Sequence, residues 1–121
     1  MEPWTADGEP VTAEDVGALL RGRMARGRYE TRLTHPDGRS LTYVTNGERA
    51  MVMLLRGPGD AGGHATSPGA VGHGDGFRLE NGQDDEYPDA DTVPLPEAFR
   101  IVAHLLATAA PPADAAWRDD R

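Results

Sequence analysis

The alternation of apolar and polar positions between residues 29 and 56 predicts an antiparallel meander of three strands. Residues 29–34 and 41–45 alternate with the two-residue period of half-buried strands. A Pro-Asp-Gly turn separates these two segments, and Asn46-Gly47 marks a second tight turn. Residues 50–55 are apolar on both faces, which is typical of a central strand that is covered on each side.

Two further segments have the spacing of amphipathic helices. Over residues 12–26, apolar side chains recur at helical intervals, and Thr12 is a suitable N-cap. Residues 94–108 begin with a proline, which the first helical turn tolerates, and carry one broad apolar face before a Pro-Pro pair ends the helix. We therefore expect an α+β fold. Its antiparallel sheet, the meander plus short additional strands, is packed by an N-terminal and a C-terminal helix.

The remaining segments are expected to form loops, termini and short strands around this framework. The length suits one domain, so we expect residues 1–121 to form a single domain. Residues 57–76 hold eight of the 15 glycines and predict a long loop that buries little surface. The other expected segments are a flexible leader at 1–11, a short strand at 77–79, an acidic loop at 84–91, an edge strand at 115–117 and a charged tail at 118–121.

Charge and cysteine content narrow the classes of partner. The chain has 12 basic and 20 acidic residues, a formal charge of −8 that repels phosphates and disfavours direct binding to nucleic acid or to an anionic membrane. There is no cysteine, which excludes disulfides and thiolate metal sites. We find neither a signal peptide nor an apolar run long enough to span a bilayer, and therefore expect a cytoplasmic protein.

The charges are unevenly distributed along the chain. Residues 21–56 carry eight arginines against three acidic residues, whereas residues 75–97 carry eight acidic residues against one arginine. A concentrated anionic segment can steer a basic partner toward it, and an aromatic residue within it can anchor the complex. The alternative is that the carboxylates only solvate the surface and that Tyr87 folds back onto the core beside Phe77. The candidate partner-binding residues are Asp75, Asp84, Asp85, Glu86, Tyr87, Asp89 and Asp91.

Catalytic motifs are weak in this sequence. Residues 57–62 spell GxGxxG after a predicted strand, but the residues that follow cannot form the helix that a dinucleotide site requires. Neither Ser40 nor Ser67 lies in a nucleophile-elbow sequence. We therefore expect a protein that acts by binding, with no enzymatic activity and no cofactor.

A metal site is conceivable at one place in the sequence. His64, His73 and Asp75 supply nitrogen and oxygen ligands that suit zinc or iron. Their spacing matches no ligand motif, and a glycine-rich loop is a poor scaffold for fixed coordination geometry. Solvated loop histidines are the favoured interpretation, and we expect no metal.

The second half of the chain contains three stretches in a familiar order. Gly76-Phe-Arg-Leu-Glu-Asn-Gly82 precedes Glu86-Tyr-Pro-Asp-Ala-Asp-Thr-Val-Pro-Leu-Pro-Glu-Ala98, and the predicted helix is followed by Pro111-Pro112-Ala-Asp-Ala-Ala-Trp117. In this order they resemble the first family of immunity proteins of bacterial polymorphic toxin systems, which are small α+β proteins encoded beside a secreted toxin. The chain differs in having Ala109-Ala110 where a glycine commonly closes the last helix.

The resemblance implies an antidote that covers the active site of a cognate toxin, and it implies no catalytic residues. Toxins paired with this family are often nucleic-acid deaminases or nucleases, whose active sites are lined by basic side chains. The acidic segment would occupy such a site, with part of residues 57–76 at its rim. Two alternatives stay open: a non-catalytic acidic adaptor or secretion chaperone, and a small metal-dependent enzyme that uses His64, His73 and Asp75.

Overall fold

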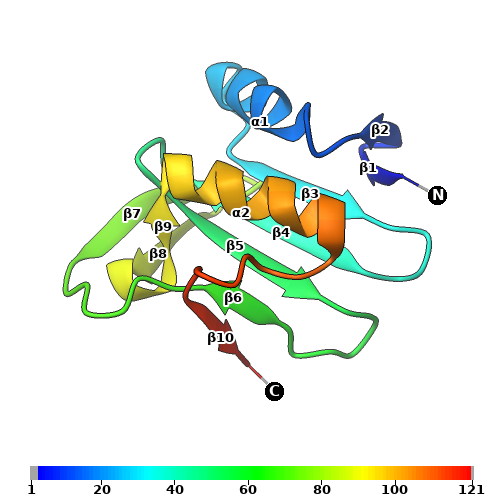
Figure 1. Cartoon of the computed structure of the whole chain (residues 1–121). Helices are drawn as coiled ribbons and strands as arrows, with labels where there is room; N and C mark the ends of the chain where they lie inside the picture. Colours follow the sequence, from blue (N-terminus) through cyan, green and yellow to red (C-terminus); the bar gives the residue numbers. More distant parts are fainter. Residues whose placement is uncertain (1–2, 121) are drawn as a thin grey trace.

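The computed structural model describes residues 3–120, which form an antiparallel sheet with two helices and a separate hairpin (Figure 1). The large sheet has eight strands, in the order β10-β6-β5-β4-β3-β1-β2, with β9 paired to β5. Strands β7 and β8 form a second, two-stranded sheet. The elements are β1 (Trp4–Ala6), β2 (Glu9–Val11), α1 (Val16–Ala25), β3 (Glu30–Thr34), β4 (Ser40–Thr45), β5 (Arg49–Leu55), β6 (Gly63–Ala65), β7 (His73–Arg78), β8 (Asp84–Pro88), the 3-10 turn η1 (Asp89–Asp91), β9 (Val93–Pro94), α2 (Leu95–Thr108) and β10 (Trp117–Asp119).

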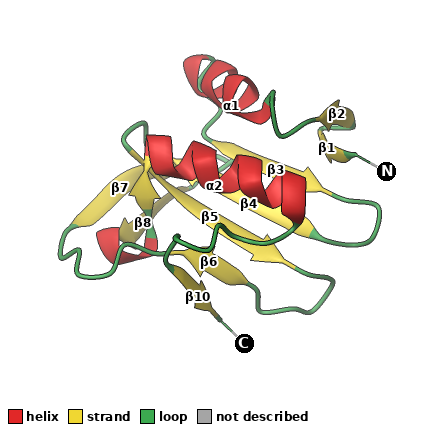
Figure 2. Ribbon diagram, viewed as in Figure 1, coloured by secondary structure: helices red, strands yellow, loops and turns green. Residues whose placement is uncertain are grey.

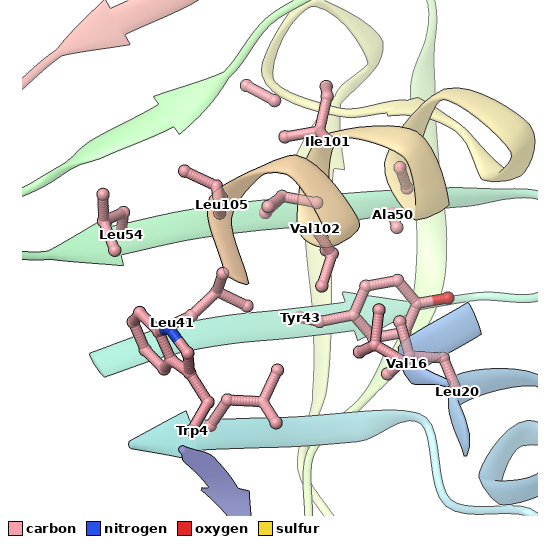
Figure 3. Packing of buried hydrophobic residues seen from close by; sticks show 14 of the residues in the cluster. Trp4, Val16, Leu20, Leu41, Tyr43, Ala50, Leu54, Ile101, Val102 and Leu105 are labelled. Atoms are coloured by element: carbon pink, nitrogen blue, oxygen red, sulfur yellow. The ribbon is translucent and has the colours of Figure 1, made fainter. Parts of the chain in front are cut away.

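The molecule has three layers, because the central strands are covered on both faces. Helices α1 and α2 lie on one face of the sheet, with α2 crossing β5 (Figure 2). On that face Tyr43 and Val52 are fully buried beneath helix residues such as Val102 (Figure 3). On the other face, Val44 and Met51 belong to a smaller cluster with Phe77 of the β7–β8 hairpin. Neither helix of the described residues is long and apolar enough to cross a membrane.

The predicted α+β class and the meander are confirmed. Strand β4 pairs with β5 over its whole length and with β3 from Ser40 to Val44, and Tyr43 lies opposite both Thr31 and Val52. The apolar character of residues 50–55 follows from burial on both sides. Ala50 and Val52 face the helices, whereas Met51 faces the hairpin.

The C-terminal helix agrees with the prediction, and the N-terminal helix begins later than expected. Helix α2 ends at Thr108, and Ala109 adopts the left-handed conformation (φ 63°) while its N–H donates to Leu105. Thr12 does not cap α1. Its hydroxyl instead accepts the N–H of Asp15 in a turn that precedes the helix.

The flexible leader predicted at residues 1–11 is wrong over its described part. Strands β1 and β2 form a hairpin through Asp7 and Gly8, which both have positive φ, as the two-residue turns that match strand twist require. Trp4 is only 4% exposed and packs on the main core. Residues 1 and 2 lie outside the described residues.

The predicted charged tail is also wrong over its described part, since β10 extends to Asp119 and pairs with β6. The two strands lie so close together at Gly63 that a side chain at this position would collide with the indole of Trp117. Trp117 itself packs against the main core. Arg121 lies outside the described residues.

Two predicted loops contain strands. Residues 57–76 include β6 and the start of β7, so only their remaining segments are loops. Residues 84–91 are β8 followed by η1 rather than an acidic loop, and the predicted strand at 77–79 is the end of a longer one. The GxGxxG stretch at 57–62 is a turn between β5 and β6, and no helix follows it.

Candidate partner-binding surface

The β7–β8 hairpin carries most of the acidic segment and is held to the sheet by its inner face. Phe77 is fully buried against Val44 and Met51. The ring of Tyr87 meets Phe77 edge-on, with centroids 4.8 Å apart. Burying a phenylalanine side chain contributes about 1.5 to 3 kcal/mol. These contacts fix one side of the hairpin and leave its other side in solvent.

A buried arginine fastens the tip of the hairpin to the body of the protein. Arg23 of α1 donates from Nε to the Thr31 hydroxyl (2.7 Å) and from Nη1 to Asp7 (2.8 Å). Its Nη2 donates to the Glu80 carboxylate in the hairpin turn (3.0 Å) and to the Glu30 carbonyl (3.1 Å). The hydrogen bond from Arg23 lowers the pKa of the Asp7 carboxyl. Every N–H group of this buried cation except one therefore has a named acceptor, as burial of a charge requires.

A second arginine fastens the opposite end of the hairpin. Arg49 donates from Nη2 to the carbonyls of Asp89 and Thr92 and to the Ser67 hydroxyl, at 2.9 to 3.1 Å. The Ser67 hydroxyl donates in turn to the Thr92 carbonyl at 2.6 Å. This network joins β5 to η1 and to the loop that precedes β7. It also engages Ser67, the serine nearest to the hairpin, in structural hydrogen bonds.

His64 was predicted to be a solvated loop histidine, and the structure contradicts this. The residue lies on β6 with its imidazole between two carboxylates, Nδ1 at 2.8 Å from Asp120 and Nε2 at 3.0 Å from Asp91. Burial lowers the pKa of the imidazole, but the hydrogen bonds to Asp120 and Asp91 outweigh it, so the net pKa is raised. When protonated, the ring donates to both carboxylates, and the two contacts join β6 to η1 and to the residue that follows β10.

Three of the predicted site residues form an exposed outer row on the hairpin. Asp75, Asp84 and Glu86 face solvent. Asp84 lies 3.2 Å from Arg78, and Glu86 lies 3.8 Å from His73, in pairs whose side chains are all more than half exposed. Exposed pairs of this kind contribute only about 0 to 1 kcal/mol, so a partner's cation can replace either one.

The other four predicted residues are less exposed and have partners within the protein. Asp85 accepts the Tyr87 hydroxyl at 2.9 Å, and burial, followed by this hydrogen bond, raises the pKa of the Tyr87 phenol. The alternative interpretation of Tyr87, packing beside the core phenylalanine, is therefore the one the structure shows. Asp89 is half-buried where its main chain joins the second arginine network, and Asp91 binds His64.

Val71 is a feature of this surface that the sequence analysis missed. Its side chain is 99% exposed, and no other large hydrophobic side chain within residues 3–120 faces solvent in this way. The surrounding loop is fixed, because the N–H of Ser67 donates to Ala90 (2.8 Å) and the N–H of Asp89 donates to Gly72 (2.9 Å). An isolated valine in a stretch of glycine, proline and alanine was the available signal.

The three candidate metal ligands are not brought together. His64 contacts Asp91 and Asp120, His73 lies beside Glu86, and the Asp75 main chain accepts a hydrogen bond from Asn46. Across residues 3–120, no group of three or more histidine, aspartate or glutamate side chains has an arrangement that could hold a metal ion.

Comparisons of the chain with protein families, with curated proteins and with solved structures found no match. The chemistry of the surface is therefore the basis for inferring function. It presents fixed, exposed carboxylates beside one exposed apolar side chain, an arrangement suited to binding a cationic surface.

Proposed function

We propose that the protein is an immunity protein that binds and neutralises a bacterial toxin domain in the cytoplasm of the producing cell. Its proposed target is a nucleic-acid deaminase or nuclease with a basic substrate site. In this proposal the protein acts by occlusion and performs no chemistry of its own. The order of sequence features that resembles the immunity family supports the proposal, as does the form of the acidic surface.

The exposed outer row is the observation that carries the proposal. Residues 73–91 contain seven acidic residues and one arginine, and Asp75, Asp84 and Glu86 face solvent. The hairpin is anchored along its inner face and at both ends, so little conformational entropy is lost when a partner binds. A preorganised anionic surface of this kind suits a site that evolved to hold a phosphate backbone.

The spacing of the carboxylates supports the same mode of binding. Asp84 and Glu86 are two residues apart on one face of β8, which places their Cα atoms about 7 Å apart at the usual rise of a strand. The outer face of β8 thus presents two negative charges at a fixed spacing, as neighbouring phosphates of a nucleic-acid strand do. Val71 lies on the adjoining fixed loop and would fill an apolar recess beside the cationic site.

Co-expression with a candidate toxin domain encoded by an adjacent gene tests the proposal. We expect the wild-type chain to restore growth and to co-purify with the toxin. The double substitution Asp75→Lys and Glu86→Lys should weaken binding by at least about tenfold at low salt, because it reverses two steering charges. The steep salt dependence of binding should also decrease.

A matched variant separates a local effect from a change in net charge. Glu9 and Glu14 are exposed and lie in and just after the β1–β2 hairpin, away from β7 and β8. Glu9→Lys with Glu14→Lys changes the formal charge from −8 to −4, as the first pair does. Protection and affinity should stay close to wild type. Equal losses in both variants would contradict the placement of the site, and survival without a complex would contradict occlusion.

A further inference from the structure

A groove of about 680 Å³ lies on the other side of the molecule from the acidic surface. It runs between the β1–β2 hairpin, the β3–β4 turn and the last turn of α2, at the end of β4 farthest from β7 (Figure 1). The proposed function leaves this groove unused. Its volume falls within the range of about 300 to 1,000 Å³ that is typical of small-molecule sites.

The walls of the groove are mainly apolar and come from rigid elements. Trp4 and Val11, which pair across β1 and β2, form one wall, and Leu106 and Ala107 of α2 form the other. Trp4 and Val11 are buried in the core, so they hold their positions whether or not the groove is filled. Apolar walls that include the planar Trp4 indole suit a flat apolar ligand.

Arg39 supplies a cationic group at one end of the groove. Its guanidinium lies over the Trp4 ring, 5.3 Å from the centroid, and its Nε donates to Asp37 at 2.7 Å. The stacking and the Nε bond fix the plane of the group. Nη1 and Nη2 make no hydrogen bond within residues 3–120, although the side chain is only 21% exposed. Two fixed N–H donors of one guanidinium match the two oxygens of a carboxylate or sulfonate.

His35 adds a second polar group beside Arg39. Its ring meets Trp4 edge-on with centroids 5.3 Å apart, and the residue lines the groove. Nδ1 lies 3.2 Å from the backbone N of Asp37 and 3.0 Å from Oδ1 of the Asp37 carboxylate. When the ring is protonated, Nδ1 donates to this carboxylate and Nε2 is left to donate elsewhere. Within residues 3–120, Nε2 has no hydrogen-bond partner.

We infer that this groove binds an amphipathic organic anion, a flat apolar body with one carboxylate or sulfonate group directed at Arg39 and His35. The apolar walls recognise the body, and the fixed N–H donors recognise the anion. The formal charge of −8 repels anions from the rest of the surface. If the groove binds an anionic ligand more tightly than its neutral analogue, the local N–H donors therefore account for the difference, because the net charge of the protein acts against it.

Two fluorescent probes of nearly the same shape test this inference on the full chain. 8-Anilino-1-naphthalenesulfonate carries the anionic group, and N-phenyl-1-naphthylamine has the same ring system without it. We expect saturable one-to-one binding of both, with the sulfonate bound about tenfold more tightly, the factor that one charge-assisted hydrogen bond provides. In Arg39→Gln this ratio of affinities should fall to about one, because glutamine keeps a polar side chain but not the cationic fork.

Two further variants locate the probes. Ala107 is exposed on α2, so Ala107→Trp fills the groove from its rim and should abolish binding of both probes in a protein with an unchanged circular dichroism spectrum. Arg32→Gln removes an exposed arginine of β3 that does not line the groove and should leave the ratio unchanged. Absent saturable binding, an unchanged ratio in Arg39→Gln, or full binding in Ala107→Trp would each overturn the inference. None of these results depends on the toxin.

Discussion

Replacing Arg23 by methionine removes the cation that joins α1 to the hairpin tip while keeping a side chain of similar length. Arg23 is buried, and its acceptors are the carboxylates of Asp7 and Glu80, the Thr31 hydroxyl and the Glu30 carbonyl. The two carboxylates are 61% and 45% exposed, so water solvates them once the arginine is gone. The Thr31 hydroxyl is buried and cannot be solvated in this way.

The magnitude follows from which acceptors lose their partner. Exposed ion pairs contribute about 0 to 1 kcal/mol, whereas a buried polar group left without a hydrogen bond costs about 1 to 3 kcal/mol. We therefore expect Arg23→Met to lower the free energy of unfolding by about 2 kcal/mol, mainly through Thr31. Arg28 contacts the same two carboxylates from an exposed position, and Arg28→Met should cost less than about 0.5 kcal/mol.

Urea denaturation measures these differences, and a double variant tests the cause. Thr31→Val removes the stranded hydroxyl, so Arg23→Met with Thr31→Val should recover about 1 kcal/mol relative to Arg23→Met alone. The reasoning is refuted if Arg28→Met destabilises the protein as much as Arg23→Met, or if Thr31→Val makes the Arg23→Met protein still less stable.

Three further predictions concern single sites. Ala109→Gly should raise the free energy of unfolding, measured by urea denaturation, by about 0.5 to 1 kcal/mol. Ala109 has a left-handed conformation (φ 63°), which glycine adopts without a side-chain clash. A lower free energy of unfolding would contradict this. Tyr43→Phe should leave the free energy of unfolding unchanged or raise it by up to about 1 kcal/mol. The Tyr43 hydroxyl is buried with no hydrogen-bond partner in residues 3–120, and burial raises its pKa to about 12. Thermal unfolding monitored by circular dichroism checks this, and a clear decrease in melting temperature would contradict the absence of a partner. His64→Gln should lower the free energy of unfolding in a pH-dependent way, because the pKa of His64 is raised in the folded protein. The stabilisation by His64 is complete below the ordinary pKa of about 6.5 and is lost as pH rises through the folded value. The difference in unfolding free energy from wild type should therefore be larger at about pH 6 than at about pH 9, and an equal difference at both would be inconsistent with a protonated ring.

Strong periodicity made the central part of the fold predictable. Strand β4 alternates from Ser40 to Tyr43, and β5 is apolar on both faces because helices cover one face and the hairpin covers the other. Helix α2 has a wide apolar face and a proline start, and its bounds agree closely with the expectation. In these segments the local pattern and the tertiary environment favour the same structure.

The acidic strand β8 and most of the three-residue strands were not predicted, because tertiary contacts and not local sequence patterns determine them. Residues 84–88 have poor strand propensity, and the packing of Tyr87 against Phe77 is what fixes them in a hairpin. Strands β1 and β6 have three residues each, too few for a period to be recognised. The edge strand predicted at 115–117 is present as β10, which begins two residues later than expected. The Asp7-Gly8 turn was the one local signal for the N-terminal hairpin.

Composition located the acidic segment in the sequence, but it did not show which side chains of this segment face solvent. Counting charges identified the acidic segment, yet it could not separate the exposed Glu86 from Asp85, which turns inward to Tyr87. Strand register makes that distinction, because neighbouring residues point to opposite faces. The groove at Arg39 was also invisible in sequence, since it joins residues from both ends of the chain.

Amide hydrogen exchange of the chain, alone and in complex with a candidate toxin domain, tests the proposed binding surface most directly. The account predicts slower exchange on binding in β7, β8 and the loop that carries Val71, with exchange in β1, β2 and the groove unchanged. Slower exchange confined to the helix face, with β7 and β8 exchanging as in the free protein, would contradict it.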